Sequence, residues 1–330
     1  MKVPHIIGAD LSKKSIDFAS HQLKTHLKVE NHPSGFLELI RWFKQQKINV
    51  TNVMIVMENT GLYGYQLEQF LHEKHITFTK VSGLAIKKSM GLVRGKSDKQ
   101  DAYRIAEYGF EKIDRLVVAE PADRLLQDLQ MLHCTRERLV KNRASLLNAV
   151  SEYQHGYKLK KTDIIIATQL RIIKTLNQEI LKLEHEIDAI VGQEKAVKEN
   201  CQLLQTIKGV GKVLAVATII KTGNFKRFTN ARKFACFCGT APFENTSGTS
   251  IRGKTRISKL RDKQMKRLLD LSAKSAIQHD KELREYYTRR TANGKSKMST
   301  INVVRNKILY RMFAVIKRQT PFVENYLKVA

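Results

Sequence analysis

Cysteine is scarce in this chain of 330 residues, which contains only four. Cys236 and Cys238 lie close together in the sequence, but no second close pair is present to complete a zinc site. We therefore expect reduced, buried thiols of the kind found in cytoplasmic proteins.

Long apolar runs are also missing. No segment is long and apolar enough to span a bilayer, and no lipidation signal is present. Residues 1–5 do not lead into an apolar stretch that ends at a small-residue cleavage site, which argues against secretion. The sequence thus predicts a cytoplasmic protein without a membrane partner.

Acidic residues are few compared with basic ones. The chain has 59 Lys and Arg against 31 Asp and Glu, a formal net charge of +28. Residues 251–330 hold 21 of the basic and 6 of the acidic residues, and the difference of +15 is about half of the net charge. A folded segment with this imbalance attracts phosphate backbones and releases their counterions, so we expect a nucleic-acid partner.

Residues 1 to about 115 show an α/β pattern, in which three strands are followed by alternating helices and strands. The expected strands are 5–10, 15–20, 23–29, 53–57 and 77–81, and the expected helices are 35–46 and 63–74.

The middle of the chain has a different pattern. Between residues 123 and 198 there is no proline, and the only glycines are Gly156 and Gly192. Leucine recurs every seven residues from 125 to 146, and apolar residues step by three and four from 173 to 190. This pattern predicts two long helices, joined near residues 155–156, with a coiled-coil seam. The helices could pair with each other or with another subunit.

Residues 200–330 are expected to be mostly helical. The sequence therefore divides into an α/β domain (1–118), a central helical coiled-coil region for oligomerisation (119–199) and a mostly α C-terminal domain (200–330).

Four acidic residues stand at the ends of expected elements in the first domain. Asp10 and Glu58 end two strands, and Asp98 and Asp101 share a face of a helix that Ser97 would cap. Each acid alone is explained by a turn or a helix start. Together they would repel one another unless a cation lay between them, and carboxylate oxygens suit Mg²⁺ or Mn²⁺. Two such ions can hold the attacking and leaving oxygens of a phosphodiester.

These acids carry a family resemblance. The runs I-G-A-D ending at Asp10, M-E-N-T-G around Glu58 and G-K-S-D-K-Q-D-A with Asp98 and Asp101 resemble those of the DEDD transposases of insertion sequences. That family includes the Piv DNA invertase and the bridge-RNA-guided recombinases. The resemblance implies a RuvC-like, RNase H-type fold for the first domain, with these four residues as its catalytic metal ligands.

The resemblance extends to the C-terminal part, through G-V-G-K-V-L-A-V-A-T-I-I and A-R-K-F-A-C-F-C-G-T-A-P. In the family, a serine in a Ser-Gly…Arg-Gly context attacks DNA and becomes joined to it. The matching residue is Ser247, with Ser250 as the less favoured choice. A neutral hydroxyl needs activation, and nearby cations could bind the scissile phosphate. These cations are Arg252, Lys254 and Arg256.

Further residues suggest contacts with nucleic acid. The turn from Gly209 to Gly211 is similar to a helix-hairpin-helix element, whose amides can hold a phosphate, although an ordinary interhelical turn explains it equally well. Lys259 and Arg261 are expected on a helix with the cations of residues 263–267, where they would contact phosphates.

The sequence contains no helix-turn-helix or zinc module that would read a DNA target. The resemblance implies a structured noncoding guide RNA, together with donor and target DNA, and a bacterial, nucleoid-associated enzyme. Cutting two DNA partners implies a dimer or tetramer. The alternatives are a RuvC-like metal-dependent junction nuclease, in which water attacks, and a non-catalytic nucleic-acid-binding protein whose acids are structural.

Overall fold

The computed structural model describes residues 4–59, 61–91, 95, 97–121, 123–247 and 251–324, apart from a few side chains that include those of 245–247, 251, 252 and 254. The chain forms two compact units, Met1–Asp123 and Arg124–Ala330. Each unit is described by itself.

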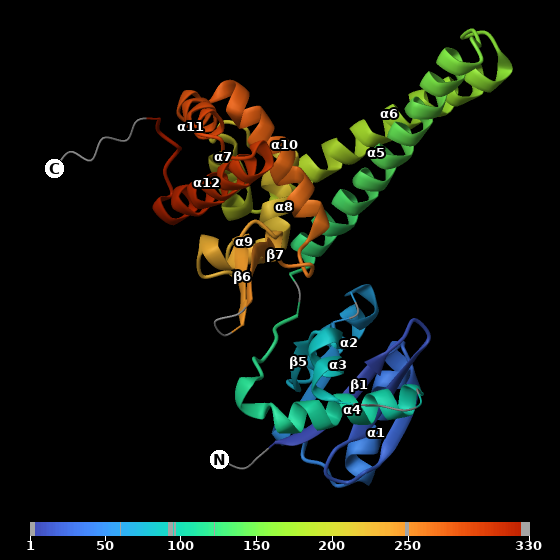
Figure 1. Cartoon of the computed structure of the whole chain (residues 1–330). Coiled ribbons are helices and arrows are strands. Elements are labelled where there is room, and N and C mark those ends of the chain that lie inside the picture. The colour runs from blue at the N-terminus through green and yellow to red at the C-terminus, as the bar shows by residue number, and fades with distance from the viewer. Residues whose placement is uncertain are drawn as a thin grey trace. The chain divides into compact units, whose positions relative to one another are not determined.

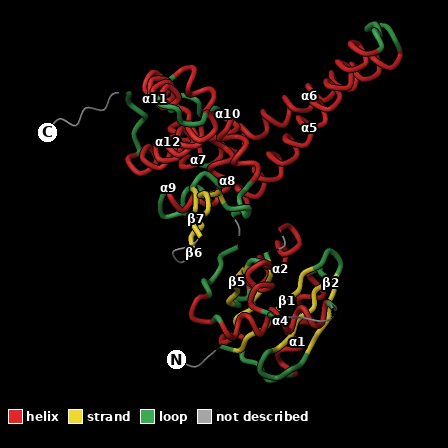
Figure 2. Tube along the Cα trace, in the orientation of Figure 1, coloured by secondary structure: helices red, strands yellow, loops and turns green. Residues whose placement is uncertain are grey.

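A five-stranded sheet with helices on its faces forms the first unit (Figures 1 and 2). The strands are β1 (His5–Leu11), β2 (Ser15–Ser20), β3 (His26–Glu30), β4 (Val53–Glu58) and β5 (Thr77–Val81), and their spatial order is β3-β2-β1-β4-β5. Strand β1 pairs antiparallel with β2 and parallel with β4, while β5 continues parallel to β4. The expected mixed α/β unit is therefore present.

The helices of this unit are α1 (Pro33–Gln45), α2 (Tyr65–Glu73), α3 (Gly83–Ser89) and α4 (Asp98–Glu111), with short 3-10 turns at Val50–Asn52, Gly61–Gly64 and Ile113–Arg115. Ile7 of β1 belongs to the core on one sheet face, with Phe36 of α1 and Leu67 of α2. Ile6 faces the other way, into a smaller core with Ile105 of α4.

Several boundaries differ from the sequence prediction by one to three residues, and two of these differences have a clear local cause. Strand β3 begins at His26 rather than 23, because residues 21–25 form the turn that returns the chain from β2. Helix α1 begins at Pro33 rather than 35, since proline is favourable at the first helical position and the His32 side chain accepts a hydrogen bond from the Ser34 amide. Helix α3 was not predicted.

The second unit is mostly helical, as expected. Two long helices, α5 (Arg124–Gly156) and α6 (Ile164–Gln193), form a hairpin that projects from the rest of the unit (Figure 1). The remaining elements are α7 (Lys195–Gln205), α8 (Lys212–Thr222), α9 (Ala231–Cys238), β6 (Pro242–Ser247), β7 (Ile251–Ile257), α10 (Lys263–His279), α11 (Lys281–Ala292) and α12 (Lys297–Arg318). The two-stranded hairpin β6–β7 was not predicted.

The apolar seam of α6 is buried within the chain. Ile173, Ile180 and Ile187 are each at most 7% exposed. Polar contacts tie the antiparallel helices together along their length: Arg136 to Glu184, and Arg143 Nη1 to Asn177 Oδ1 at 2.8 Å. Of the two pairings that the sequence left open, the structure shows the one within the chain.

The cysteine prediction is correct only in part. All four thiols are free, and Cys201 and Cys238 are buried, but Cys134 is exposed. Among the described residues, no helix is both long and apolar enough to cross a membrane.

Candidate active site and nucleic-acid interface

Asp10 and Glu58 lie near the carboxyl ends of two neighbouring parallel strands, β1 and β4. Ala9 of β1 is paired with Met57 of β4 in parallel register, so the next residue on each strand points to the same face. The carboxylate of Glu58 lies against Gly83, where a β-carbon would come within 2.1 Å of Glu58 Oε1. A glycine at the start of α3 therefore leaves room for this acid.

Helix α4 brings the other two acids to this face. Gly8 points to the same side of β1 as Asp10, and a β-carbon on it would lie 2.1 Å from the carbonyl oxygen of Ala102 in α4. The absence of a side chain thus lets the helix pack directly on the strand. Asp98 and Asp101 are in the first turn of the helix, which begins after Ser97, as predicted. The Ser97 side chain accepts a hydrogen bond from the Gln100 amide.

The electrostatics of Asp10 reflect this arrangement. Burial is the main cause that raises its pKa, from 3.8 to about 6. Four neighbouring carboxylates add to the effect, in decreasing order: Asp101, Asp98, Asp17 and Glu58. The other three predicted acids therefore lie near enough to Asp10 to disfavour its charged form.

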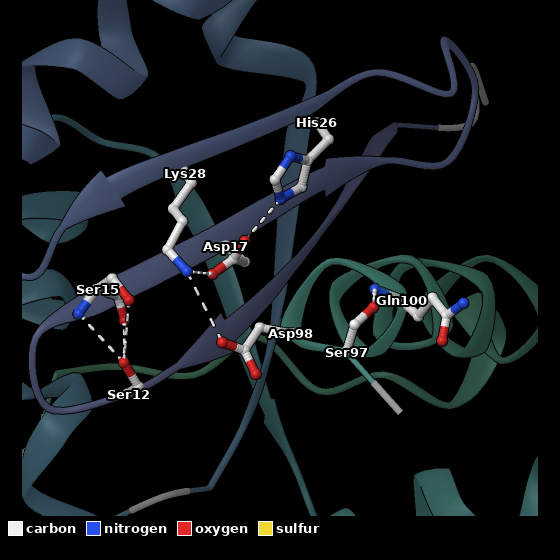
Figure 3. A network of polar contacts seen from close by, with 8 residues as sticks. All are labelled: Ser12, Ser15, Asp17, His26, Lys28, Ser97, Asp98 and Gln100. Carbon is white, nitrogen blue, oxygen red and sulfur yellow. Dashed lines mark hydrogen bonds and ion pairs between the residues drawn. The ribbon is translucent and has the colours of Figure 1, made fainter. Parts of the chain in front are cut away.

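The sequence interpretation missed a group of polar residues beside these acids. Asp17 of β2 lies directly across from Asp10 in the β1–β2 pair and is almost fully buried. Its Oδ1 is 2.7 Å from His26 Nε2, and its Oδ2 is 3.4 Å from Lys28 Nζ (Figure 3). The same Lys28 nitrogen is 3.8 Å from Asp98 Oδ2. The sequence signal that could have identified this group is Asp17 itself, an acid inside the expected strand of residues 15–20.

The fit of these residues to a divalent cation is incomplete. Within the described part of the chain, no three acids, histidines or cysteines are close enough to hold one metal ion. Asp98 is paired with Lys28, and Asp101 Oδ1 accepts from Arg104 Nη1 at 2.7 Å. The donor chemistry nevertheless suits Mg²⁺ or Mn²⁺, because half-buried Asp10 and the neighbours that raise its pKa are all hard carboxylate ligands.

Ser247 belongs to the second unit, where it is the last residue of β6. It is paired with Ile251 of β7, so its backbone is in a strand. Arg252 is paired with Thr246, and Arg256 is exposed near the base of the hairpin. The side chains of Ser247, Arg252 and Lys254 and the whole of Ser250 lie outside the described residues.

The remaining predicted contacts fall in two places. Gly209 has a positive φ of 88° and packs so closely on α10 that a β-carbon would lie 2.6 Å from the Ser272 carbonyl oxygen. Gly211 is the exposed N-cap residue of α8. The predicted helix for Lys259 and Arg261 is wrong, because α10 begins only at Lys263, where the Asp262 side chain caps it.

Arg261 nevertheless lines a cationic pocket of about 260 Å³. The pocket is formed by the turn before α10 and by α10 and α12, and its lining residues are Arg261, Lys263, Lys266, Arg267, Asp270, Met298 and Arg305. Burial, together with Arg305 and Arg261, lowers the pKa of Lys266 to about 8. Five cations around one acid form a site that suits a phosphate group.

Two family models match the chain. Residues 7–157 match a model described as a transposase, of the DEDD type, and residues 201–288 match the transposase IS116/IS110/IS902 family. The pilin gene-inverting protein of Moraxella bovis is 27% identical over 324 residues, which cover 96% of this chain and 97% of that protein. The transposase for insertion sequence element IS1111A of Coxiella burnetii is 28% identical over 56% of each chain. A probable family 20 transposase of Pseudomonas aeruginosa is 26% identical over 82% of this chain and 83% of that protein.

Proposed function

The chain belongs to the IS110-type DEDD transposases, enzymes that cleave and rejoin DNA, and we propose that it does so with two separate parts of its sequence: a carboxylate metal site and a nucleophilic serine. The observation that carries the first part is the placement of Asp10 and Glu58 on neighbouring parallel strands, with Asp98 and Asp101 in the first turn of the helix that packs on β1 at Gly8. The strand order of the first unit supports a RuvC-like, RNase H-type fold for this site.

In this proposal Asp10, Glu58, Asp98 and Asp101 bind one or two Mg²⁺ or Mn²⁺ ions. A divalent ion at this edge would neutralise the charge of the scissile phosphate and favour ionisation of an attacking hydroxyl. Asp17 has a positioning role, because its contacts with His26 and Lys28 fix the strand next to Asp10. Arg104 holds Asp101 and would have to share that carboxylate with the metal.

The second part is Ser247. Its Oγ attacks phosphorus, the bond from phosphorus to the leaving deoxyribose oxygen breaks, the serine proton is released, and the leaving oxygen takes up a proton. The phosphoserine diester keeps the bond energy, so a DNA hydroxyl can reverse the reaction without ATP. The position of Ser247 at the end of β6, followed on β7 by Arg252, Lys254 and Arg256, supports this assignment.

A suicide substrate, in which the strand beyond the cut is too short to stay bound, tests the serine directly. We expect wild-type enzyme to accumulate a protein–DNA adduct on a denaturing gel, Ser247→Ala to give neither cleavage nor adduct, and Ser250→Ala to give both. Cleaved DNA without attached protein would mean that water attacks. The junction-nuclease alternative would then replace the serine mechanism, while the carboxylate site would stand.

Partner choice and assembly complete the proposal. A structured noncoding guide RNA pairs with donor and target DNA, while the positively charged second unit holds the phosphates. The phosphate contacts are Arg261 in the cationic pocket, Lys259 shortly before it in the chain, and the turn Gly209–Gly211 before α8. The enzyme works as a dimer or tetramer in the bacterial nucleoid. The α5–α6 hairpin is the coiled-coil region within 119–199, and it joins subunits through its outer surface. The division into 1–118, 119–199 and 200–330 stays a prediction.

Purified complexes test this part of the proposal. Protein isolated with the transcript of the flanking DNA should retain one structured RNA and lose directed cleavage after ribonuclease treatment. Directed cleavage that survives complete removal of RNA would exclude RNA guidance and leave the chemistry of the two catalytic parts unaffected.

A further inference from the structure

The cationic pocket of the second unit is held together by hydrogen bonds among α9, α10 and α12. Lys266 Nζ, on α10, donates to the carbonyl oxygen of Gly239 and to Asn302 Oδ1 on α12, both at 2.8 Å. Asn302 Oδ1 also accepts from Arg305 Nη1 at 3.2 Å. These contacts fix two of the pocket's cations by bonds within the protein, so the site is formed in advance of a ligand.

Gly239 determines the position of a third cation, Arg261. Gly239 follows α9 as its C-cap residue with a φ of 68°, and a β-carbon on it would lie 2.4 Å from Arg261 Cβ. Any side chain at this position would therefore displace Arg261 from the end of α9. Arg261 Nη1 donates to the Ser258 carbonyl oxygen at 3.2 Å. Within the described residues the other guanidinium N–H groups have no acceptor, so they can serve a ligand.

The five cations of the pocket differ in whether an acid balances them. Arg267 is paired with Glu137, and Arg305 is paired with Asp270. The other three form no ion pair in the part of the chain that the structure describes, and they are Arg261, Lys263 and Lys266. The pocket therefore holds more positive charge than its own acids neutralise, and an anion is the partner that it lacks.

Lys266 shows the effect of this excess charge most clearly. Burial is the main cause that lowers its pKa to about 8, and Arg305 and Arg261 add to the effect. Asp270 on α10 and Cys238 on α9 act in the opposite direction but do not restore the ordinary pKa. An anion bound beside Lys266 would favour the charged amine and would raise this pKa again.

The lining also contains an apolar side chain. Met298 of α12 is 60% exposed and lies among the cations. Nitrogen donors from two helices and a turn can surround the oxygens of a phosphate, while a methionine beside them offers a contact to an attached sugar or base. A phosphate that is part of a strand uses both features, whereas a free phosphate uses only the first.

We propose that this pocket binds one internal phosphate of a nucleic-acid strand. The three unpaired cations contact the phosphate, while Arg267 and Arg305 stay with their acids and form the walls. The inference rests on the proposed function for the identity of the partner, but it involves neither the carboxylate site nor Ser247.

Isothermal titration calorimetry of the wild-type full chain in metal-free buffer tests the proposal. The probe is the dinucleotide d(ApA), whose single phosphate is internal. Titrations in buffers with different enthalpies of ionisation measure the protons taken up on binding. We expect uptake of more than half a proton at pH 8.5, because Lys266 becomes charged, and almost none at pH 6.5. Lysines with the ordinary pKa of about 10.4 would take up almost none at either pH, so the uptake reports on Lys266.

Three other probes identify the chemistry that is bound. The same dinucleotide with a neutral methylphosphonate linkage should cause no uptake, and equal uptake would show that the phosphate charge is not recognised. Uptake with inorganic phosphate but not with d(ApA) would assign the pocket to a free or terminal phosphate. Uptake with tetraglutamate but not with d(ApA) would assign it to an acidic protein segment. Each of these results would overturn the proposal, as would d(ApA) that does not bind or that binds without proton uptake.

Variants test the individual cations. Arg261→Gln should bind d(ApA) about tenfold more weakly, with proton uptake still detectable because Lys266 stays buried. Lys266→Met should bind without proton uptake. Lys281→Gln, at an exposed position of α11 outside the pocket lining, removes an equal charge and should change neither quantity. Unaltered affinity in Arg261→Gln, or undiminished uptake in Lys266→Met, would contradict the assignment.

The outcome is independent of the cleavage proposal. Titration with d(ApA) requires neither metal nor cleavage, so a negative result removes the pocket assignment alone. If the suicide substrate shows no adduct while d(ApA) binds with proton uptake, the pocket assignment stands and the serine mechanism fails.

Discussion

Replacement of Asp10 by asparagine should make the metal-free protein more stable at neutral pH. Asparagine has nearly the shape of a protonated aspartate but never carries the charge that Asp101, Asp98, Asp17 and Glu58 repel. The pKa of Asp10 is raised from 3.8 to about 6, which corresponds to about 3 kcal/mol at about 1.36 kcal/mol for each pKa unit. Because Asp10 is only half-buried, solvent screening reduces the expected gain to about 1–2 kcal/mol.

The gain should depend on pH with a definite sign. The folded protein keeps the Asp10 proton to a higher pH than the unfolded chain does, so the contribution of this group to the free energy of unfolding falls as pH rises from about 4 to about 6. Asp10→Asn lacks this fall. The difference between Asp10→Asn and wild type should therefore be close to zero near pH 4 and reach its full value above pH 7. Added Mg²⁺ should stabilise wild type and leave the variant unchanged.

Urea unfolding in EDTA, followed by tryptophan fluorescence, is the appropriate assay. The sequence has one tryptophan, Trp42, which is buried in α1 of the first unit, so the signal reports on the unit that contains the acids. Asp114→Asn, at an exposed position of the same unit, is the control and should show no pH-dependent difference of this size. The electrostatic reasoning would be refuted if Asp10→Asn were less stable than wild type at pH 7.5. It would also be refuted if the difference in the free energy of unfolding between variant and wild type were the same near pH 4 and at pH 7.5.

Three further predictions concern contacts described above. Gly8→Ala should lower the free energy of unfolding by about 1–3 kcal/mol in the same assay, because its β-carbon would overlap the Ala102 carbonyl. Gly192→Ala in α6, with open space around it, should not destabilise the helical second unit, as followed by circular dichroism. Lys28→Met should tighten Mn²⁺ binding several-fold by electron paramagnetic resonance, since Lys28 competes for Asp98; unchanged binding would show that the Lys28 charge does not compete with the metal. Lys263→Gln should reduce the slope of log affinity for DNA against log salt by about 1, and an unchanged slope would remove Lys263 from the phosphate contacts.

Elements with a buried periodic pattern were predictable from the sequence. The strands that end in Asp10 and Glu58 are apolar runs, and Ser97 followed by two acids is a readable helix start. The β6–β7 hairpin was missed because its strands are rich in polar residues and give no apolar face to recognise. The start of α10 was misplaced although Asp262, which also pairs with Lys221, is an ordinary N-cap residue.

Contacts that depend on strand register were not predictable. Asp17 lies beside Asp10 only because β1 and β2 are paired with these two residues opposite each other, and Lys28 reaches Asp98 only because α4 crosses this face of the sheet. The closeness of that crossing depends on Gly8, whose role requires knowledge of the partner helix. Sequence patterns locate the acids on their elements, whereas the tertiary structure determines which cations balance them.

The position of β1 in the middle of the sheet has a consequence for synthesis on the ribosome. Strands β1, β2 and β3 emerge first and can form an antiparallel meander, but the other edge of β1 stays open until β4, which starts at Val53, has been made. The helix that carries Asp98 and Asp101 emerges later still and covers Gly8 last. The nascent chain therefore exposes an apolar strand edge until that stage, and translational pausing between β3 and β4 should favour aggregation or chaperone binding.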